Sequence, residues 1–254
     1  KIEAFAKQLF DEGKTHGALL VAEGETVIYE GAFGLADRSL NIPNSPKMRF
    51  WDASVGKMFT AVLILQLLEE EKMSLRDPIS KHLPWFKHNM ADKITIHDLL
   101  SHRSGFSSQV YEERAKAEHD QKSQRSILEQ KIAKTALAFE PGTAFLYSNT
   151  GYVLLASIVE KVTGEDFVEL SRKWIFEPLK MTNTSIRTNQ EKKELNNLAY
   201  GHKKDSLGRF VNANNFLSSN YAIWLGKRKG PGRVSSNAFD LLLWDQALYG
   251  ESLV

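Results

Sequence analysis

The sequence contains no cysteine, and this absence excludes several kinds of site at once. Without thiols the chain has no disulfide, no thiolate metal ligand and no cysteine nucleophile. Its seven histidines are scattered, without the spacing of a metal-binding pair on one helix face. His97 and His102 are five residues apart, which fits one helix face poorly, so we expect structural roles for both. The composition therefore predicts neither a metal nor another cofactor.

A strong charge of one sign and a long apolar run are also absent. The net charge is +2 over 254 residues, which gives no reason to expect nucleic acid or an anionic membrane as a partner. No apolar run is long enough to predict a membrane span. Hydrophobic residues make up 42% and charged residues 25% of the chain, as is ordinary for a globular protein. The length fits one large domain or two intimately packed ones with a substantial core.

An S-x-x-K sequence runs from Ser54 to Lys57, at the start of a long apolar segment. From Met58 to Leu68 only Thr60 and Gln66 interrupt the apolar residues, which predicts a helix that is buried on most sides. Residues three apart share a helix face, so Ser54 and Lys57 can touch. The positive end of a helix dipole also favours an alkoxide at its first turn. The pattern indicates a serine nucleophile with an adjacent base, and the alternative is an N-cap serine followed by a solvated lysine.

A second motif, Tyr147-x-Asn149, is the only Y-x-N in the chain and lies 93 residues after Ser54. A nearby cation favours the phenolate, so a tyrosine can share or relay the serine proton with a lysine. An asparagine two residues later can offer a donor and an acceptor to a substrate amide. The alternative is that Tyr147 packs in the core and Asn149 caps the following helix. Because each motif precedes an apolar helix, the two together favour catalysis.

The remaining elements are predicted from periodicity and from turn residues. Apolar residues recur at helical spacing in four segments, and we expect helices at residues 2–12, Tyr152–Val162, 166–176 and Phe239–Leu248. In the first of them, Ile2, Phe5, Leu9 and Phe10 should lie on one side. A hairpin is expected from Gly17–Ala22 and Thr26–Ala32, and short strands from Lys93–Ile96 and Tyr221–Leu225. The strongly charged segment from residue 111 to 134 is expected to be a solvated helix.

Five stretches of the chain resemble the serine β-lactamase and penicillin-binding-protein superfamily, in its class C and esterase-like branch. They read FWDASVGKMFTA, ITIHDLLSHRSGF, EPGTAFLYSNTGYVLLASIVEKVTGEDF, IFEPLKMTNTS and GRVSSNAFDLLLWDQAL, and the likeness covers the chain from about residue 17 to its end. The resemblance implies an α+β fold, with an antiparallel sheet flanked by helices and a mostly helical domain, and with Ser54 between the two. Residues 1–50 and about 225–254 would belong to the sheet domain, and residues 51–224 to the helical one.

The resemblance also implies the roles of the residues. Ser54 would attack an amide, lactam or ester carbonyl, and Lys57 and Tyr147 would take and return its proton. Asn149 would orient the substrate, and the Ser54 backbone N–H would be one oxyanion donor. We expect an acyl-enzyme hydrolase of the β-lactamase, D-Ala-D-Ala carboxypeptidase or esterase type, with a small-molecule or peptide substrate. The resemblance suggests a periplasmic or extracellular protein.

One motif of the superfamily is missing. No Lys-Thr-Gly, Lys-Ser-Gly or His-x-Gly occurs, and Arg228-Lys229-Gly230 is a poor substitute because the Gly-Pro-Gly that follows suits no central strand. In the superfamily this motif lies on a strand after a helix like Phe239–Leu248. We therefore expect these residues to be a fragment or one piece of a swapped assembly, whose incomplete sheet a C-terminal segment or a second chain completes. The hairpin would then lie bare at an edge or pair with another chain, and acylation would be slow or absent.

Two other classes of protein compete with this interpretation. An α/β-hydrolase requires Gly-x-Ser-x-Gly, but the residues around Ser54 lack the first glycine, and the chain shows no alternation of strands and helices. The stronger alternative is a non-catalytic or crippled relative that binds peptide or cell-wall fragments, since the third motif is missing. Covalent labelling by an acylating probe would separate a hydrolase from a binding module.

Overall fold

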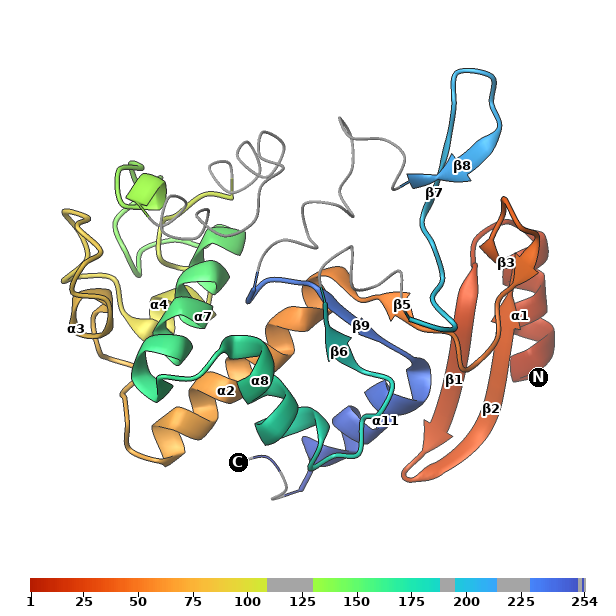
Figure 1. The fold of residues 1–254 in the computed structure, drawn as a ribbon, viewed down its shortest axis with the longest axis horizontal. Coiled ribbons are helices and arrows are strands. Elements are labelled where there is room, and N and C mark those ends of the chain that lie inside the picture. The colour runs from red at the N-terminus through yellow and green to blue at the C-terminus, as the bar shows by residue number, and fades with distance from the viewer. Residues whose placement is uncertain (109–129, 188–194, 214–228, 251–252, 254) are drawn as a thin grey trace. The chain divides into compact units, whose positions relative to one another are not determined.

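The computed structural model describes residues 1–108, 130–187, 195–213, 229–250 and 253, which form two compact units (Figure 1). The sheet unit comprises residues 1–52, 176–226 and 234–253, and the helical unit comprises residues 53–175 and 227–233. The α+β fold class agrees with the sequence prediction. Residues 176–224, which the prediction assigned to the helical domain, group with the sheet unit, and residues 227–233, which it assigned to the sheet domain, group with the helical unit. None of the described helices has the length and apolar character needed to cross a membrane.

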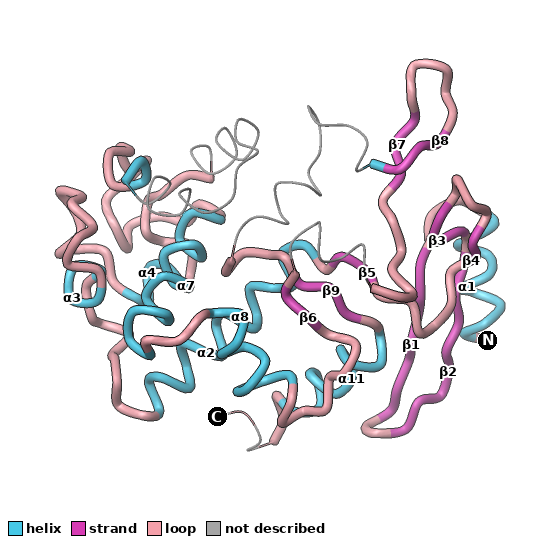
Figure 2. Tube along the Cα trace, viewed as in Figure 1, coloured by secondary structure: helices cyan, strands magenta, loops and turns pink. Residues whose placement is uncertain are grey.

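The sheet unit carries all the strands of the described chain. Its elements are α1 (Ile2–Asp11), β1 (Gly17–Glu23), β2 (Thr26–Phe33), β3 (Leu35–Asp37), β4 (Ile42–Pro43), β5 (Phe50–Trp51), β6 (Ser185–Ile186), β7 (His202–Lys204), β8 (Phe210–Asn212), β9 (Val234–Ser236) and α11 (Ala238–Ala247). The strands form four small sheets with the orders β1-β2, β3-β4, β5-β9-β6 and β7-β8, and all the pairs within them are antiparallel (Figure 2).

The hairpin β1–β2 forms where the sequence predicted it. Its register pairs Gly17 with Phe33 and Glu23 with Thr26, and Gly24 supplies the positive φ at the turn. No residue of either strand is fully buried, and within the described residues each strand pairs only with the other. This agrees with the predicted open edge. Whether a further segment or a second chain completes the sheet stays a prediction.

Helices cover parts of this hairpin. Helix α1 packs on β2, and α11 packs on β1. The predicted apolar side of α1 is partly wrong, because Phe5 is 62% exposed while Phe10 stacks on Phe33 with ring centroids 5.6 Å apart. Helix α11 begins where predicted, because the Asn237 side chain caps it by accepting the Asp240 N–H.

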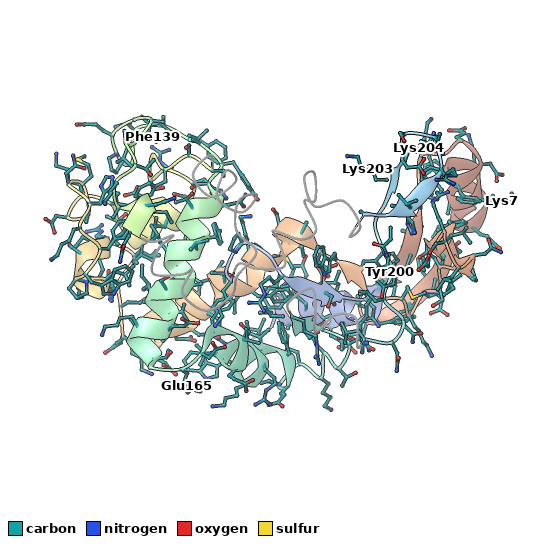
Figure 3. All side chains as sticks on the ribbon, turned by 45° about the horizontal axis from the view of Figure 1, so that its top comes forward. Lys7, Phe139, Glu165, Tyr200, Lys203 and Lys204 are labelled. Carbon is teal, nitrogen blue, oxygen red and sulfur yellow. The ribbon has the colours of Figure 1, made fainter. Side chains whose placement is uncertain are left out.

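The β7–β8 hairpin is a polar extension of the sheet unit. Figure 3 shows Lys203 and Lys204 on β7, both exposed, and Tyr200 just before this strand. The Tyr200 N–H donates to the Ala36 carbonyl at 2.8 Å, which ties the base of this hairpin to β3. The Lys204 ammonium lies 5.3 Å from the centre of the Phe210 ring on β8.

The helical unit is built around two apolar helices that pack on each other. Its elements are η1 (Ala53–Val55, a 3₁₀ turn), α2 (Gly56–Glu69), α3 (Ile79–His82), α4 (Ile96–Leu100), α7 (Asn149–Thr163) and α8 (Phe167–Ser171), which continues into η2 (Arg172–Phe176), a π-helical turn. Helices α3, α4 and α8 all pack on α7, and α8 also packs on α2. The core of α2 is as apolar as predicted, and Phe59, Leu63, Ile64 and Leu67 have no exposed surface.

One predicted element differs in the structure, and two others lie mostly or wholly outside the described residues. The strand predicted at Lys93–Ile96 is reduced to one isolated bridge between Thr95 and Pro78. Thr95 instead caps α4, because its side chain and that of Asp98 form a reciprocal capping box. The helix predicted between residues 111 and 134 lies mostly outside the described residues, and the strand predicted at Tyr221–Leu225 lies entirely outside them.

Candidate active site

Ser54 lies in the turn η1, which leads directly into α2. Its predecessor Ala53 has a φ of 42°, a left-handed conformation that costs energy for a residue with a Cβ. Such strain is found where the surrounding structure holds a backbone turn in place, and functional sites are frequent examples. The turn leaves Ser54 partly exposed while the next turn of α2 is buried.

Lys57 lies one turn later and is buried, with only 6% of its surface exposed. Its Nζ lies 3.0 Å from Ser54 Oγ, 2.7 Å from Asn149 Oδ1 and 3.4 Å from the Pro231 carbonyl oxygen. Burial lowers the pKa of Lys57 from 10.5 to about 8, because the ammonium loses its water. The predicted contact of Lys57 with Ser54 is confirmed.

Tyr147 reaches the same hydroxyl from the segment before α7. Its Oη donates to Ser54 Oγ at 2.7 Å, and the side chain is 42% exposed. Lys57 Nζ also lies 4.7 Å from the centre of the Tyr147 ring. The predicted meeting of Tyr147 Oη with Lys57 Nζ at Ser54 is therefore confirmed.

Asn149 is the first residue of α7 and is buried. The alternative of a capping role is wrong, because Ser148 is the N-cap and accepts the Gly151 N–H at 3.1 Å. The Asn149 side chain instead accepts a hydrogen bond from Lys57. All four predicted residues therefore come together within the helical unit, and a contact between Asn149 and a substrate stays a prediction.

The segment from Lys229 to Pro231 also lies against α2. The Thr60 hydroxyl donates to the Gly230 carbonyl at 2.7 Å, next to the contact between Lys57 and Pro231. The Lys229 ammonium is held by Glu160, at 2.9 Å, and by Asp166. Lys229 is thus engaged with two carboxylates. The atoms of Gly230 and Pro231 that contact α2 are carbonyl oxygens, which cannot donate a hydrogen bond to an oxyanion. These contacts argue against Arg228-Lys229-Gly230 as a substitute for the third motif.

Sequence reasoning missed two residues that hold the Y-x-N segment. His102 was predicted to be structural, and its contacts agree with that, but its target was not predicted: its carbonyl and its ring accept the N–H groups of the residues on either side of Tyr147. Ser108 Oγ accepts the Asn149 N–H at 2.9 Å and donates to the Tyr147 carbonyl at 3.3 Å. For His102 the only signal in the sequence was the stretch LLSHRSGF, which supported the resemblance without indicating a role, and Ser108 lies outside that stretch.

The groups gathered at Ser54 are a hydroxyl, an amine, a phenol and an amide. The hydroxyl can attack a carbonyl, the amine and the phenol can transfer protons, and the amide can donate and accept hydrogen bonds. Within the described part of the chain, no cluster of three carboxylate or imidazole side chains is placed to hold a metal ion.

Comparisons with known proteins identify the family of this chain and several of its relatives. A family model described as Beta-lactamase matches residues 2–254. Penicillin-binding protein 4* of Bacillus subtilis (strain 168) is 30% identical over 257 residues, which cover 100% of this chain and 56% of that protein. The teichoic acid D-alanine hydrolase of Staphylococcus aureus is 30% identical over 206 residues, covering 81% of this chain and 49% of that protein. The chain thus spans about half the length of these curated relatives.

A solved structure shows the same fold. The crystal structure of a penicillin-binding protein from Bacillus halodurans superimposes with a TM-score of 0.81 at 28% sequence identity. The superposition covers 98% of this chain and 73% of that one.

Proposed function

This chain belongs to the Beta-lactamase family, and from that premise we propose that it is a serine hydrolase that works through an acyl-enzyme. One observation carries the proposal: Ser54 Oγ lies within hydrogen-bond distance of both Lys57 Nζ and Tyr147 Oη. A nucleophile in contact with a base and with a second proton carrier is the arrangement that covalent catalysis requires.

The contacts of Lys57 define how it would act as a base. When the amine is neutral, its two N–H groups can donate to Asn149 Oδ1 and the Pro231 carbonyl. Its lone pair then faces Ser54 Oγ and can accept the serine proton. Because the pKa of Lys57 is lowered to about 8, roughly a tenth of the molecules carry the neutral amine at pH 7.

Acylation then proceeds in two steps. Ser54 Oγ attacks the carbonyl carbon while its proton passes to Lys57 Nζ, and the carbonyl π electrons move onto oxygen. The resulting oxyanion accepts a hydrogen bond from the Ser54 backbone N–H. When the tetrahedral intermediate collapses, the bond to the leaving group breaks, and Tyr147 Oη donates its proton to that group. Lys57, now protonated, returns a proton to Tyr147. Water releases the acyl group by the same steps in reverse order.

The substrate we propose is an amide, lactam or ester, such as a β-lactam, a peptide ending in D-Ala-D-Ala or a D-alanyl ester. The names of the relatives, which are penicillin-binding proteins and a teichoic acid D-alanine hydrolase, support this range. The same names support the proposal that the protein works in the cell envelope, in a periplasmic or extracellular location. In this proposal, Asn149 orients the substrate amide or ester.

The proposal is tested with the variant Ser54→Ala and a fluorescent penicillin or phosphonate probe. We expect the unaltered chain to take up one covalent label at Ser54 and the variant to take up none, with the same circular dichroism spectrum. Ser74→Ala is a matched control, because it removes a hydroxyl from the same unit in the exposed loop after α2, away from Lys57 and Tyr147. A label that persists in Ser54→Ala and maps to another serine would contradict the proposal.

The same experiment separates the enzyme from a binding module. A non-catalytic relative that binds peptide or cell-wall fragments would take up no covalent label, although it could still retain the probe reversibly. For a labelled chain, the substrate class follows from turnover of nitrocefin, a D-Ala-D-Ala peptide and p-nitrophenyl acetate.

A further inference from the structure

His102 holds the backbone on both sides of Tyr147. It follows α4 in a left-handed conformation with a φ of 61°. Its carbonyl accepts the Leu146 N–H at 2.9 Å, and its ring nitrogen Nδ1 accepts the Ser148 N–H at 3.1 Å. One residue thus binds the N–H groups of the residues immediately before and after the tyrosine that reaches Ser54.

The imidazole ring of His102 also packs on the rings around it. Its centroid lies 4.5 Å from that of Tyr147 and 5.2 Å from that of Tyr152, and both rings are tilted by less than 40° relative to it. The Tyr152 hydroxyl donates to the Leu100 carbonyl, so this second ring is itself anchored. The imidazole therefore supports the Tyr147 ring against α7, which limits the positions that Tyr147 Oη can take.

We propose that His102 is a positioning residue for the acylation step, which holds Tyr147 Oη at Ser54 through the Nδ1 contact with Ser148 and through ring packing. This inference rests on the proposed serine hydrolase function. It assigns no proton transfer to His102, because the contacts of this residue are with Tyr147 and its neighbours rather than with Ser54.

The role requires an uncharged imidazole with its proton on Nε2. A protonated ring would point an N–H at the Ser148 N–H and lose the hydrogen bond. The titratable groups that face His102 are Lys57 on α2 and Tyr147 and Tyr152 beside it. Burial, together with the charge of Lys57, lowers the pKa of His102 below its usual value of 6.5. The acceptor is therefore present at neutral pH.

Two variants separate the hydrogen bond of His102 Nδ1 from the packing of its ring. His102→Phe keeps a ring but removes the acceptor, whereas His102→Asn offers an oxygen near the position of Nδ1 and tolerates the left-handed backbone. The matched control is His88→Asn. His88 is also a buried histidine that stacks on Phe86 and accepts a backbone N–H two residues later, from Met90, but it does not contact Tyr147.

The measurement is the single-turnover rate of labelling by a fluorescent penicillin, at increasing probe concentration. We expect His102→Phe to lower the limiting acylation rate about ten-fold, as one lost hydrogen bond implies, without weakening reversible binding of the probe. His102→Asn should recover most of that loss. His88→Asn should lower the midpoint of thermal unfolding and leave the acylation rate of the folded chain unchanged.

The pH dependence adds a readout that a purely structural role would not change. Loss of neutral Lys57 makes the logarithm of the acylation rate fall with a slope of one below about pH 8. In the unaltered chain the slope should exceed one while the pH falls through the pKa of His102, because the protonated ring loses the same hydrogen bond and adds a further loss of about ten-fold. In His102→Asn it should stay at one.

Different outcomes contradict different statements. If the unaltered chain takes up no label at Ser54, the proposed function fails. If it is labelled, but His102→Phe acylates at the same rate, the positioning role is wrong. If neither His102 variant folds, nitrogen-15 NMR of the unaltered chain at pH 7 measures the charge and the tautomer of the His102 ring. A neutral ring with its proton on Nε2 and a hydrogen bond from Ser148 supports the role, and a charged ring or one protonated on Nδ1 overturns it.

Discussion

The lowered pKa of Lys57 predicts how acylation depends on pH. Burial takes this pKa from 10.5 to about 8, so the amine loses its proton as the pH rises through about 8. The neutral fraction is about a tenth at pH 7 and about nine-tenths at pH 9. If neutral Lys57 accepts the proton of Ser54, the acylation rate should rise about ten-fold over this range and then level off.

The same shift has a consequence for stability. Between pH 8 and 10.5 the unfolded chain carries a proton on Lys57 that the folded chain has lost, so the free energy of unfolding rises with pH in this window. A shift of 10.5 − 8 = 2.5 pH units corresponds to about 3 kcal/mol. Below about pH 8 the folded chain also carries charged Lys57, and the cost of burying that charge lowers the free energy of unfolding by the full amount. The free energy of unfolding of the unaltered chain, measured against Lys57→Met by urea titration, should therefore rise by about this amount between pH 8 and 10.5.

The assay for the catalytic part is single-turnover labelling by a fluorescent penicillin from pH 6 to 9.5. Lys57→Arg keeps the charge but cannot accept a proton, so it should acylate at least about a hundred-fold more slowly at every pH. Lys72→Arg, in the exposed turn after α2, should behave like the unaltered chain. A rate that is independent of pH would refute the reasoning. A rate that falls above pH 8 would show that the protonated lysine is the active form and that Tyr147 removes the proton from Ser54.

The remaining predictions concern Tyr147 and the segment beside Lys57. Tyr147→Phe should keep the ring contacts with His102 but lose the bond to Ser54 Oγ, so acylation should fall about a hundred-fold or more in the same labelling assay, with little change in thermal midpoint. Gly230→Ala should lower the free energy of unfolding by about 2 kcal/mol or more, because φ is 96° and the new Cβ would clash with the Tyr152 carbonyl oxygen. Gly208→Ala is its control in urea titrations, since φ there is 76° but the new Cβ would meet open space. If both variants lose the same free energy of unfolding, the clash at Gly230 is not the cause.

How much of this site could be predicted from the sequence depends on the range of the interactions. The contact of Ser54 with Lys57 could be predicted because residues three apart share a helix face and the apolar run after Lys57 specifies a buried helix. The helix α7 followed in the same way from its apolar residues and from Gly164, whose φ of 73° ends it. The predicted strand at Lys93–Ile96 was wrong because local capping by Thr95 outweighed a weak strand pattern.

The meeting of the two motifs is different, because it joins residues 93 positions apart. Only the resemblance to a known family predicted that Tyr147 would approach Ser54, since no local pattern specifies such a contact. The support that His102 gives to Tyr147 was not predicted, because an imidazole in a loop has no periodicity to reveal its partners. The contacts of Pro231 and Gly230 with α2 were also invisible, since a carbonyl oxygen belongs to every residue alike.

The sequence by itself determined which chemical groups are present and which helices carry them, because helix formation and helix burial follow from neighbours a few positions apart. The tertiary structure decided how those groups act on one another. It buried Lys57, which lowered its pKa, and it placed Asn149 and Pro231 where they accept its hydrogen bonds. Burial and long-range hydrogen bonds depend on which segments pack together, and only the folded chain specifies that.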